Sequence, residues 1–390
     1  MLDFQTAGES HGKGIVTVVS GFPSQLEIDP GFIQEQLSRR QGGFGSGPRM
    51  QMEKDEVEIL SGIRWKKTIG APIVTFVRNK DFSNWEKIMD PLGDRPFGYQ
   101  DITIPRPGHA DLSGAVKYHF RDLRNVIERA SARETVGRCV AGSLARLFLR
   151  SFGIQVGGFV ESIAGIISQI DVPFQEKIKA SLPSPIYTFD LEKEREMIQA
   201  IEKAKREGDS VGGTFIVVAS GVVPGLGGYC QTRDRIDARL AAALMSIPSV
   251  KGVEIGDGFL SSRLLGSQVH DEMGYCAAKK PFSIFRKTNH SGGIEGGTST
   301  GEPIWVRCAM KPIPTLRKEL VSVDIKTREE VSARYERSDV CAVPRGLVVG
   351  ESMVAWVLAQ TVQEKLGGDS MDEILDRFQA YLLYLERFPD

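Results

Sequence analysis

The stretch that most constrains the fold is a predicted helix from about Asp122 to Phe152, along which glycine, alanine and serine recur. Each interior glycine costs a helix roughly 1 kcal/mol relative to alanine, so close packing has to compensate. Small side chains also let neighbouring elements approach the helix closely. We therefore expect a central, buried helix. Its small residues are Ala130, Ser131, Ala132, Gly137, Ala141, Gly142 and Ala145.

Strand and helix signals alternate irregularly on both sides of this helix. β-branched runs bounded by glycine or proline predict strands at 14–21, 57–60, 73–77 and 213–221. Asp29 as N-cap and Pro30 in the first turn predict a helix that runs toward Arg40. Further helices are expected at 191–207 and 236–246, and two C-terminal helices, at 350–366 and 372–387, are expected to be ordinary amphipathic cover.

The chain shows no linker between two autonomous halves, and glycine-rich loops recur along it. Residues 78–108 form one long segment with many Pro, Asp and Gly residues. Loops of this length in compact domains are usually functional or disordered. We therefore expect residues 1–390 to form one α+β domain with long functional loops.

Charge and cysteine content exclude several classes of protein. The formal net charge is -1, which gives no global attraction to nucleic acid or to an anionic membrane, so any anion site must come from local clusters of arginine and lysine. The five cysteines are scattered without a CxxC pair, which argues against a disulfide framework or a metal site. With neither a secretory signal nor an apolar run long enough to cross a bilayer, the chain is expected to be cytoplasmic.

Two histidines are held in stiff, accessible backbone. His11 lies in Gly8-Glu9-Ser10-His11-Gly12, and His109 follows Pro107 and Gly108, with Asp111 two residues further on. Either histidine alone could be a solvent-facing residue of a glycine-rich turn. The two together favour an active site, because a rigidly held imidazole near a carboxylate suits proton transfer.

Arginines near these motifs indicate an anionic ligand. Arg129 and Arg133 are four residues apart and so are expected on one face of the predicted helix. A single arginine is more often part of a surface salt bridge. A buried arginine, however, needs an Asp, a Glu or a ligand as partner. Further candidates are Arg39, Arg40, Arg49, Arg106 and Arg337.

Three other segments could contact a phosphate or a reacting group. The loop 291–297 supplies backbone N–H groups unobstructed by side chains, although it matches no standard nucleotide motif and could equally be a packing loop. The segment 311–315 places Lys311 and Thr315 on a proline-stiffened backbone. Residues 337–339 combine a cation, a hydroxyl and a carboxylate.

Six segments, in this order along the chain, resemble the signature segments of the chorismate synthase family. They are collinear and span about residues 5–360. The segments are GESHG at 8–12, RPGHAD at 106–111, RASARET at 129–135, SGGIEGG at 291–297, MKPIPT at 310–315 and RSDVCAVP at 337–344.

The resemblance implies a lyase of the shikimate pathway, which leads to the aromatic amino acids. Its reaction is the 1,4-anti elimination of phosphate from 5-enolpyruvylshikimate 3-phosphate to give chorismate. Reduced FMN is then the cofactor, with no net redox change, and NADPH or a separate flavin reductase would keep it reduced. A homotetramer is implied, as is a fold in which central helices are sandwiched between antiparallel β-sheets.

The resemblance also implies residue roles. His11 would protonate the leaving phosphate, His109 would protonate the reduced flavin, and Asp339 would assist flavin N5 as a base. Substrate anions would contact Ser10, Arg40, Arg49, Arg133 and Arg337. The flavin would contact Arg129, Ala130, Ser131, Ser249, Gly296, Lys311, Pro312, Ile313, Pro314, Thr315 and Arg337, and NADP would contact Arg40 and Ser46.

The chain departs from the family pattern in two places. Phe44, Ser46 and Pro48 stand where many bacterial members carry basic residues, which weakens an NADPH contact through that loop, and Ala130 replaces a serine. Two other classes of function stay open from the residues alone. One is a non-catalytic RNA- or anion-binding protein, although the net charge and the dispersed arginines argue against it. The other is a flavin oxidoreductase with true hydride turnover, which would consume NADPH in proportion to its product.

Overall fold

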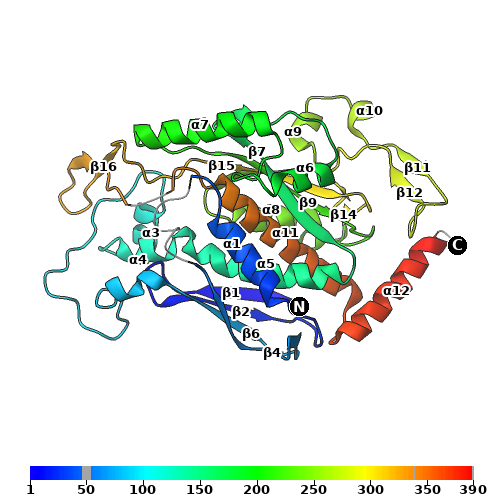
Figure 1. Ribbon diagram of the computed structural model, residues 1–390, viewed down its shortest axis with the longest axis horizontal. Coiled ribbons are helices and arrows are strands. Elements are labelled where there is room, and N and C mark those ends of the chain that lie inside the picture. Colours follow the sequence, from blue (N-terminus) through cyan, green and yellow to red (C-terminus); the bar gives the residue numbers. More distant parts are fainter. Residues whose placement is uncertain (46–53, 337–338, 389–390) are drawn as a thin grey trace.

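The computed structural model describes residues 1–45, 54–336 and 339–388. Two antiparallel β-sheets enclose a layer of helices (Figure 1). This arrangement confirms the predicted fold class, an α+β fold with central helices between antiparallel sheets. In the part of the chain that the structure describes, no helix is long and apolar enough to cross a membrane.

The first sheet contains four strands in the order β1-β2-β6-β3, all paired antiparallel. The bounds are β1 Asp3–Ala7, β2 Gly14–Ser20, β6 Ile73–Arg78 and β3 Val57–Ser61. These bounds confirm the strands predicted at 14–21, 57–60 and 73–77. The β1–β2 connection carries His11, so the sheet's end positions the first histidine.

The second sheet contains five strands in the order β10-β15-β9-β7-β8. The bounds are β10 Val250–Ile255, β15 Ile304–Met310, β9 Gly213–Ser220, β7 Gln155–Ile163 and β8 Ile166–Ile167. The predicted strand at 213–221 is therefore confirmed. β15 ends where the segment 311–315 begins, so this sheet positions the predicted lysine and threonine.

Helices α1 (Pro30–Gln41), α5 (Thr135–Arg150) and α11 (Val343–Leu366) fill the space between the sheets. α5 packs on β1 and β2, α11 packs on β7 and β9, and the two helices pack on each other. A Cβ atom at Gly142 of α5 would lie 2.3 Å from the Cβ of Ser352, so the predicted close approach through small residues is confirmed. At the start of α1, the side chain of Asp29 accepts from the Phe32 N–H at 3.1 Å, as a predicted N-cap should.

The helix predicted from 122 to 152 is not continuous. It comprises α4 (Arg124–Arg129), the short 3-10 helix η2 (Ala132–Glu134) and α5. Ser131 interrupts it with an extended backbone, ψ 142°, and its side chain caps η2 by accepting from the Arg133 N–H. Arg129 and Arg133 therefore do not share a helix face, and that expectation was wrong because a serine made a local cap instead of continuing the helix.

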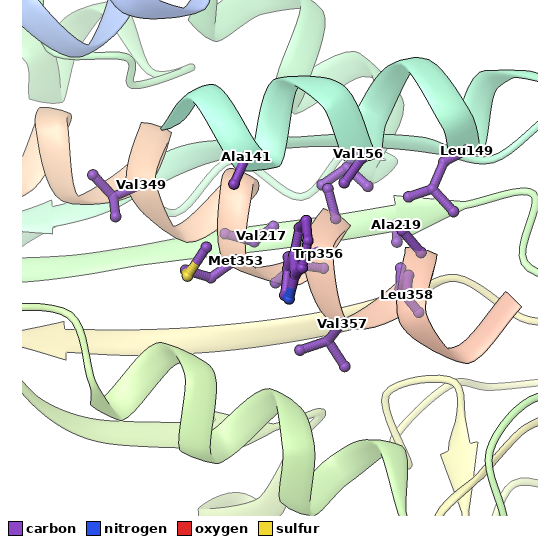
Figure 2. Close-up of a cluster of buried hydrophobic side chains, with 14 of the residues drawn as sticks. Ala141, Leu149, Val156, Val217, Ala219, Val349, Met353, Trp356, Val357 and Leu358 are labelled. Atoms are coloured by element: carbon purple, nitrogen blue, oxygen red, sulfur yellow. The ribbon is translucent and has the colours of Figure 1, made fainter. Parts of the chain in front are cut away.

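The C-terminal helices differ from each other. α11 begins earlier than predicted and is buried along nearly its whole length, so it belongs to the core and is not amphipathic cover. Figure 2 shows its side chains, Trp356 among them, packed against residues of α5, β7 and β9 such as Leu149, Val156 and Val217. α12 (Met371–Arg387) buries only one side and is the covering helix that was predicted.

The other elements complete the chain around these layers. The predicted helices at 191–207 and 236–246 are confirmed as α7 Leu191–Glu207 and α8 Ile236–Met245. The remaining helices are η1 Lys80–Asn84, α3 Asp111–Tyr118, α6 Phe174–Ser181, η3 Thr232–Asp234, α9 Gly258–Ser261 and α10 Gly266–Val269. The remaining strands are β4 Ile63–Arg64, β5 Lys67–Thr68, β11 Met273–Tyr275, β12 Ile284–Arg286, β13 Ile294–Glu295, β14 Thr298–Ser299, β16 Val321–Val323 and β17 Glu330–Ser332.

Candidate active site

The loop between β1 and β2 holds His11 in a fixed position. The Nδ2 group of Asn79, just after β6, donates to the carbonyl oxygens of Glu9 at 3.0 Å, Ser10 at 3.2 Å and Gly12 at 2.8 Å. Asn79 is itself buried. One side chain therefore holds three carbonyl groups of the loop, and the imidazole is presented from a rigid backbone.

Glu128 of α4 orients the His11 ring. Its Oε1 lies 2.8 Å from His11 Nδ1, and its Oε2 accepts the His11 backbone N–H at 2.8 Å. Burial alone would raise the pKa of Glu128, but the hydrogen bonds from His11 outweigh it and the pKa is lowered. An ionised Glu128 accepts from Nδ1, so Nε2 is the nitrogen left to meet a ligand.

Trp85 and Arg124 complete the first cluster. The Trp85 ring lies 4.0 Å from the His11 ring, centroid to centroid, and the Arg124 guanidinium lies 4.9 Å from the Trp85 centroid. Arg124 Nη1 also donates to Glu128 Oε1 at 3.2 Å. The indole thus shields one side of the imidazole from water, while the arginine neutralises the buried carboxylate.

His109 belongs to a second cluster of the same composition. Its Nδ1 lies 2.5 Å from Asp111 Oδ1, and Arg106 grips the same carboxylate through Nε at 2.8 Å and Nη2 at 3.0 Å. Asp111 is fully buried. Burial would raise its pKa, but the hydrogen bonds from His109 and Arg106 hold the pKa well below its ordinary value. Each predicted histidine therefore has a buried, ionised carboxylate behind it.

The segment 311–315 packs against the His109 loop. Lys311 Nζ donates to the Gly108 carbonyl, and Arg106 Nη1 donates to Thr315 Oγ1 at 3.2 Å. Gly108 has φ +78°, and a Cβ atom there would lie 3.4 Å from both Lys311 Nζ and Pro314 Cβ. A glycine is needed at this position because the backbone is left-handed and closely packed.

Ser249 and Ser210 hold the segment 311–315 through hydrogen bonds to its backbone. The Lys311 N–H donates to the Ser249 carbonyl at 2.9 Å, and Ser210 Oγ donates to the Ile313 carbonyl at 2.7 Å. The predicted residues Ser249 and Lys311 through Thr315 therefore lie together beside His109.

Asp55 unites two of the predicted substrate arginines. Arg40 Nη1 donates to Asp55 Oδ2 at 3.1 Å, and Arg133 Nη1 donates to Asp55 Oδ1 at 2.6 Å. Arg133 Nε also donates to Asn79 Oδ1 at 2.7 Å, which links the pair to the His11 loop. All of these side chains are buried. The structure thus brings Arg40 and Arg133 together next to His11.

Asp339 and Arg345 lie at the entrance to α11 and pair with each other. Arg345 is close enough to Arg40 and Asp55 for both to affect its pKa, which burial lowers. Among the described residues, its buried Nε and Nη2 have no hydrogen-bond partner. Among the described side chains of this group, Arg40, Arg133 and Arg345 face the carboxylates of Asp55 and Asp339. This local excess of positive charge suits an anionic ligand. Arg49, Arg337, Ser46 and Pro48 lie outside the described residues.

Comparison with known proteins places the whole chain in one family. A sequence profile of chorismate synthase matches residues 2–363. The chorismate synthase of Alkaliphilus metalliredigens is 50% identical over 382 residues, which cover 98% of this chain and 99% of the relative. That of Aquifex aeolicus is 48% identical over 402 aligned positions, covering 99% of each chain. The chain belongs to the chorismate synthase family.

A solved structure extends this match to the fold. It is described as a crystal structure of chorismate synthase, and it superimposes with a TM-score of 0.81 at 40% identity, covering 99% of each chain. The activity of the chain is accordingly that of the chorismate synthase family, the lyase reaction that yields chorismate.

Within the chorismate synthase fold, Arg129 and Ser131 contact the His11 loop and β1, and Arg129 also borders an open cavity. Arg129 donates to the carbonyls of Thr6 at 2.7 Å and Gly8 at 3.0 Å, and Ser131 Oγ donates to Ser10 Oγ at 3.1 Å. Arg129 also lines a cavity of about 500 Å³. Its other walls combine apolar side chains, among them Phe4, Met353 and Trp356, with the charged side chains of Glu134 and Arg138.

Among the described residues that were predicted to contact the flavin, Gly296 lies apart from Lys311 and Ser249. It lies in the β13–β14 turn, whose Gly297 carbonyl accepts the Ile236 N–H at the start of α8. Ser249 follows the opposite end of α8. A helix of this length separates its ends by roughly 15 Å at 1.5 Å per residue. Within one chain, Gly296 therefore does not join Lys311 and Ser249.

Sequence reasoning missed the partners of the predicted residues. Glu128, Trp85, Arg124 and Asp55 all contact the site, and only fold-dependent contacts bring them there. One local signal was present, since Arg124 and Glu128 are spaced i, i+4 on a helix that leads into the RASARET segment.

Proposed function

We propose that His11 and His109 carry out separate proton transfers in the elimination of phosphate from 5-enolpyruvylshikimate 3-phosphate. One observation carries this assignment: both histidines have Nδ1 against a buried carboxylate that an arginine also holds. Such a pairing sets the tautomer and orients Nε2 toward a ligand. Two imidazoles held in this way suit two acid–base steps more than a single binding contact.

His11 serves the phosphate end of the substrate. It adjoins Ser10 and, through Asn79, the Arg40–Asp55–Arg133 group, where the described side chains carry an excess of positive charge. Arginines suit phosphate and carboxylate oxygens, and a proton from His11 lowers the charge on the departing group. Arg49 and Arg337 are proposed to contribute further contacts.

The residues beside His109 fit the phosphate and ring of a flavin. Beside His109, Lys311 and Thr315 offer a cation and a hydroxyl. Arg129 and Ser131 lie against the His11 loop, where Arg129 lines a cavity with apolar walls that we assign to the flavin ring. When bound, reduced FMN supplies a transient electron that helps phosphate to leave, with no net redox change. We assign His109 to holding a proton toward the flavin and Asp339 to assisting as a base.

The source of reducing equivalents concerns the two proposed NADP contacts, Arg40 and Ser46. Of the two proposed NADP contacts, Arg40 is only 5% exposed and is committed to Asp55 and Thr135. This geometry argues against a direct NADP contact through Arg40, so we propose that NADPH acts through a separate flavin reductase.

We also propose a cytoplasmic homotetramer. The five free cysteines suit a reducing compartment. The segment around α9, α10 and β11 exposes large apolar side chains, and exposed patches of this kind often mark subunit contacts. They include Phe259, Leu265, Met273 and Tyr275.

Anaerobic turnover tests the proposed function. Purified protein with reduced FMN and 5-enolpyruvylshikimate 3-phosphate should release phosphate and form chorismate in equal amounts. No phosphate release would contradict the proposal. NADPH consumption stoichiometric with product would indicate an oxidoreductase, and salt-dependent retention of RNA on a filter would indicate a nucleic-acid-binding protein.

Two variants separate the roles of the histidines. His109→Ala should slow turnover by roughly 10²–10⁴, the usual range for general acid–base catalysis, with FMN affinity within a modest factor of the wild type. His11→Ala should slow phosphate release by a similar factor. Unchanged turnover in either variant would remove that histidine from the mechanism.

A further inference from the structure

A chain of charged contacts joins the two histidine clusters. Glu336 lies in the middle of it, on the segment that follows β17. The chain runs from His11 through Glu128, Arg124, Glu336, Arg106 and Asp111 to His109. The roles proposed above use its two ends and leave its centre unexplained.

The Glu336 carboxylate faces arginines from both clusters. Its Oε2 lies 3.6 Å from Arg106 Nη1, and its Oε1 lies 3.8 Å from Arg124 Nη1. Arg334 on the same segment is 3.4 Å away through Nε, but its side chain is 40% exposed. Arg106 and Arg124 are 8% and 10% exposed, so water screens their charges little. These separations exceed hydrogen-bond length, so Glu336 acts here through its charge.

Each buried arginine is therefore shared between two carboxylates. Arg106 lies between Asp111 and Glu336, and Arg124 lies between Glu128 and Glu336. The charges of Glu128, Glu336 and Asp111 balance those of Arg124, Arg106 and Arg334. Without the negative charge of Glu336, each arginine would neutralise its histidine's carboxylate more completely.

We propose that Glu336 is a positioning residue that couples the two histidines, so that a change of charge at one is felt at the other. The proposal rests on the acid–base roles assigned above to His11 and His109. Glu336 touches neither ring and acts through Arg124 and Arg106. A proton that leaves one histidine removes a positive charge from one end of the chain, which makes retention of a proton at the other end more favourable.

The direction of the pH shift expected on removing the Glu336 charge follows from the signs of the charges in the chain. Removing the Glu336 charge disfavours a positive imidazole at both ends, because an opposite charge that favoured it is lost. The pH dependence of phosphate release and that of FMN binding should then both shift toward lower pH. A purely structural role for Glu336 predicts a loss of stability or rate without this shared shift.

The test compares Glu336→Gln with Glu330→Gln, which makes the same charge change at an exposed residue of the neighbouring strand β17. Two quantities are measured from roughly pH 5.5 to 9, the range in which histidines titrate. The first is kcat for phosphate release with reduced FMN under anaerobic conditions. The second is the dissociation constant of oxidised FMN, measured by flavin fluorescence.

Glu336→Gln should lower both pH midpoints by roughly 0.5 to 1 pH unit and reduce kcat near neutrality by roughly 3- to 10-fold. KM should change less than about 2-fold, because Glu336 is not a substrate contact. Glu330→Gln should match the wild type in every measurement. Unmoved midpoints in Glu336→Gln, or a shift of one midpoint without the other, would overturn the coupling.

Glu336→Asp guards against a folding artefact. It keeps the charge on a shorter side chain, so its midpoints should stay near those of the wild type even if its melting temperature falls. Midpoints that move as far as in Glu336→Gln would also overturn the proposal. If wild-type protein released no phosphate, the proposed function would fail, whereas the FMN titration would still test Glu336.

Discussion

Two adjacent arginines of α1 pair with two different buried carboxylates. Arg39 donates to Glu351 through Nη1 at 2.6 Å and Nη2 at 3.0 Å, while Arg40 donates to Asp55 at 3.1 Å. Each carboxylate also holds a second arginine, Arg146 at 3.1 Å for Glu351 and Arg133 at 2.6 Å for Asp55. The two clusters are thus alike in composition.

The Glu351 cluster and the Asp55 cluster differ in the other groups that they contact. The Glu351 cluster is built on α1, α5 and α11 and is completed by Gln36, which accepts from both of its arginines. The Asp55 cluster is built largely from connecting segments, and through Asn79 it reaches the His11 loop. Buried ion pairs therefore do not identify a site by themselves, and connection to a reactive group does.

The largest expected effect is on the helix cluster. Glu351→Ala would leave Arg39 and Arg146 buried without a counter-charge, and removing one partner of a buried pair typically costs about 3–5 kcal/mol. Thermal or urea unfolding measures the loss, which added substrate should not restore. A stability within about 1 kcal/mol of the wild type would contradict a structural role for this cluster.

Asp55→Asn should give a smaller loss of stability that a ligand can repair. The amide retains hydrogen bonds but removes the charge, at a cost of about 1–3 kcal/mol. An anionic substrate can then supply the missing counter-charge, so 5-enolpyruvylshikimate 3-phosphate should raise the melting temperature of this variant more than that of the wild type. An equal shift in both proteins would place the Asp55 cluster outside the substrate site.

The neighbouring arginines allow a matched pair of substitutions. Lysine keeps the charge but loses the forked geometry of the guanidinium. Arg39→Lys should lower stability by about 1–2 kcal/mol and leave KM nearly unchanged. Arg40→Lys should raise KM by roughly 10-fold with a smaller loss of stability. If Arg39→Lys raised KM and Arg40→Lys mainly lowered stability, the structural role and the substrate-binding role assigned to the two clusters would have to be exchanged.

The smallest effect is a pH dependence of stability in the His11 cluster. The folded-state pKa of Glu128 is lowered from its ordinary 4.5, so its stabilising contribution is present above about pH 4.5 and is lost as the pH falls toward the folded value. Glu128→Gln should therefore flatten the fall in melting temperature below pH 4.5. Parallel melting curves for variant and wild type would show that His11 does not hold this carboxylate ionised.

Local signals predicted much of the secondary structure and little of the pairing. The helix from Leu191 to Glu207 and the N-cap at Asp29 were predictable because their causes lie within a few residues. The break at Ser131 was missed because its side chain satisfies the backbone of Arg133, a choice that depends on surroundings. α11 was misjudged because its burial on every side is decided by distant elements that pack around it, namely α1, α5, α8, β7 and β9.

The residues of the candidate site divide in the same way, into those that local sequence marks and those that only the fold brings together. His11, His109 and the segment 311–315 could be found because glycine and proline mark stiff, accessible backbone. Glu128 and Asp55 could not, since many carboxylates in the sequence are equivalent until the fold brings one beside a buried arginine. The placement of Gly296 away from Ser249 likewise depends on the direction of α8.

The burial of α11 also affects how the chain can fold during synthesis. β7 and β9 present apolar side chains to a helix that is made much later, and Gln360 and Gln363 of α11 donate to the carbonyls of Leu2 and Gly21. A ribosome-bound chain therefore carries uncovered strands until its C-terminal part emerges. Such intermediates are prone to aggregation and to slow closure of long-range contacts. Nascent chains that end before Val343 should consequently depend on chaperones to remain in solution.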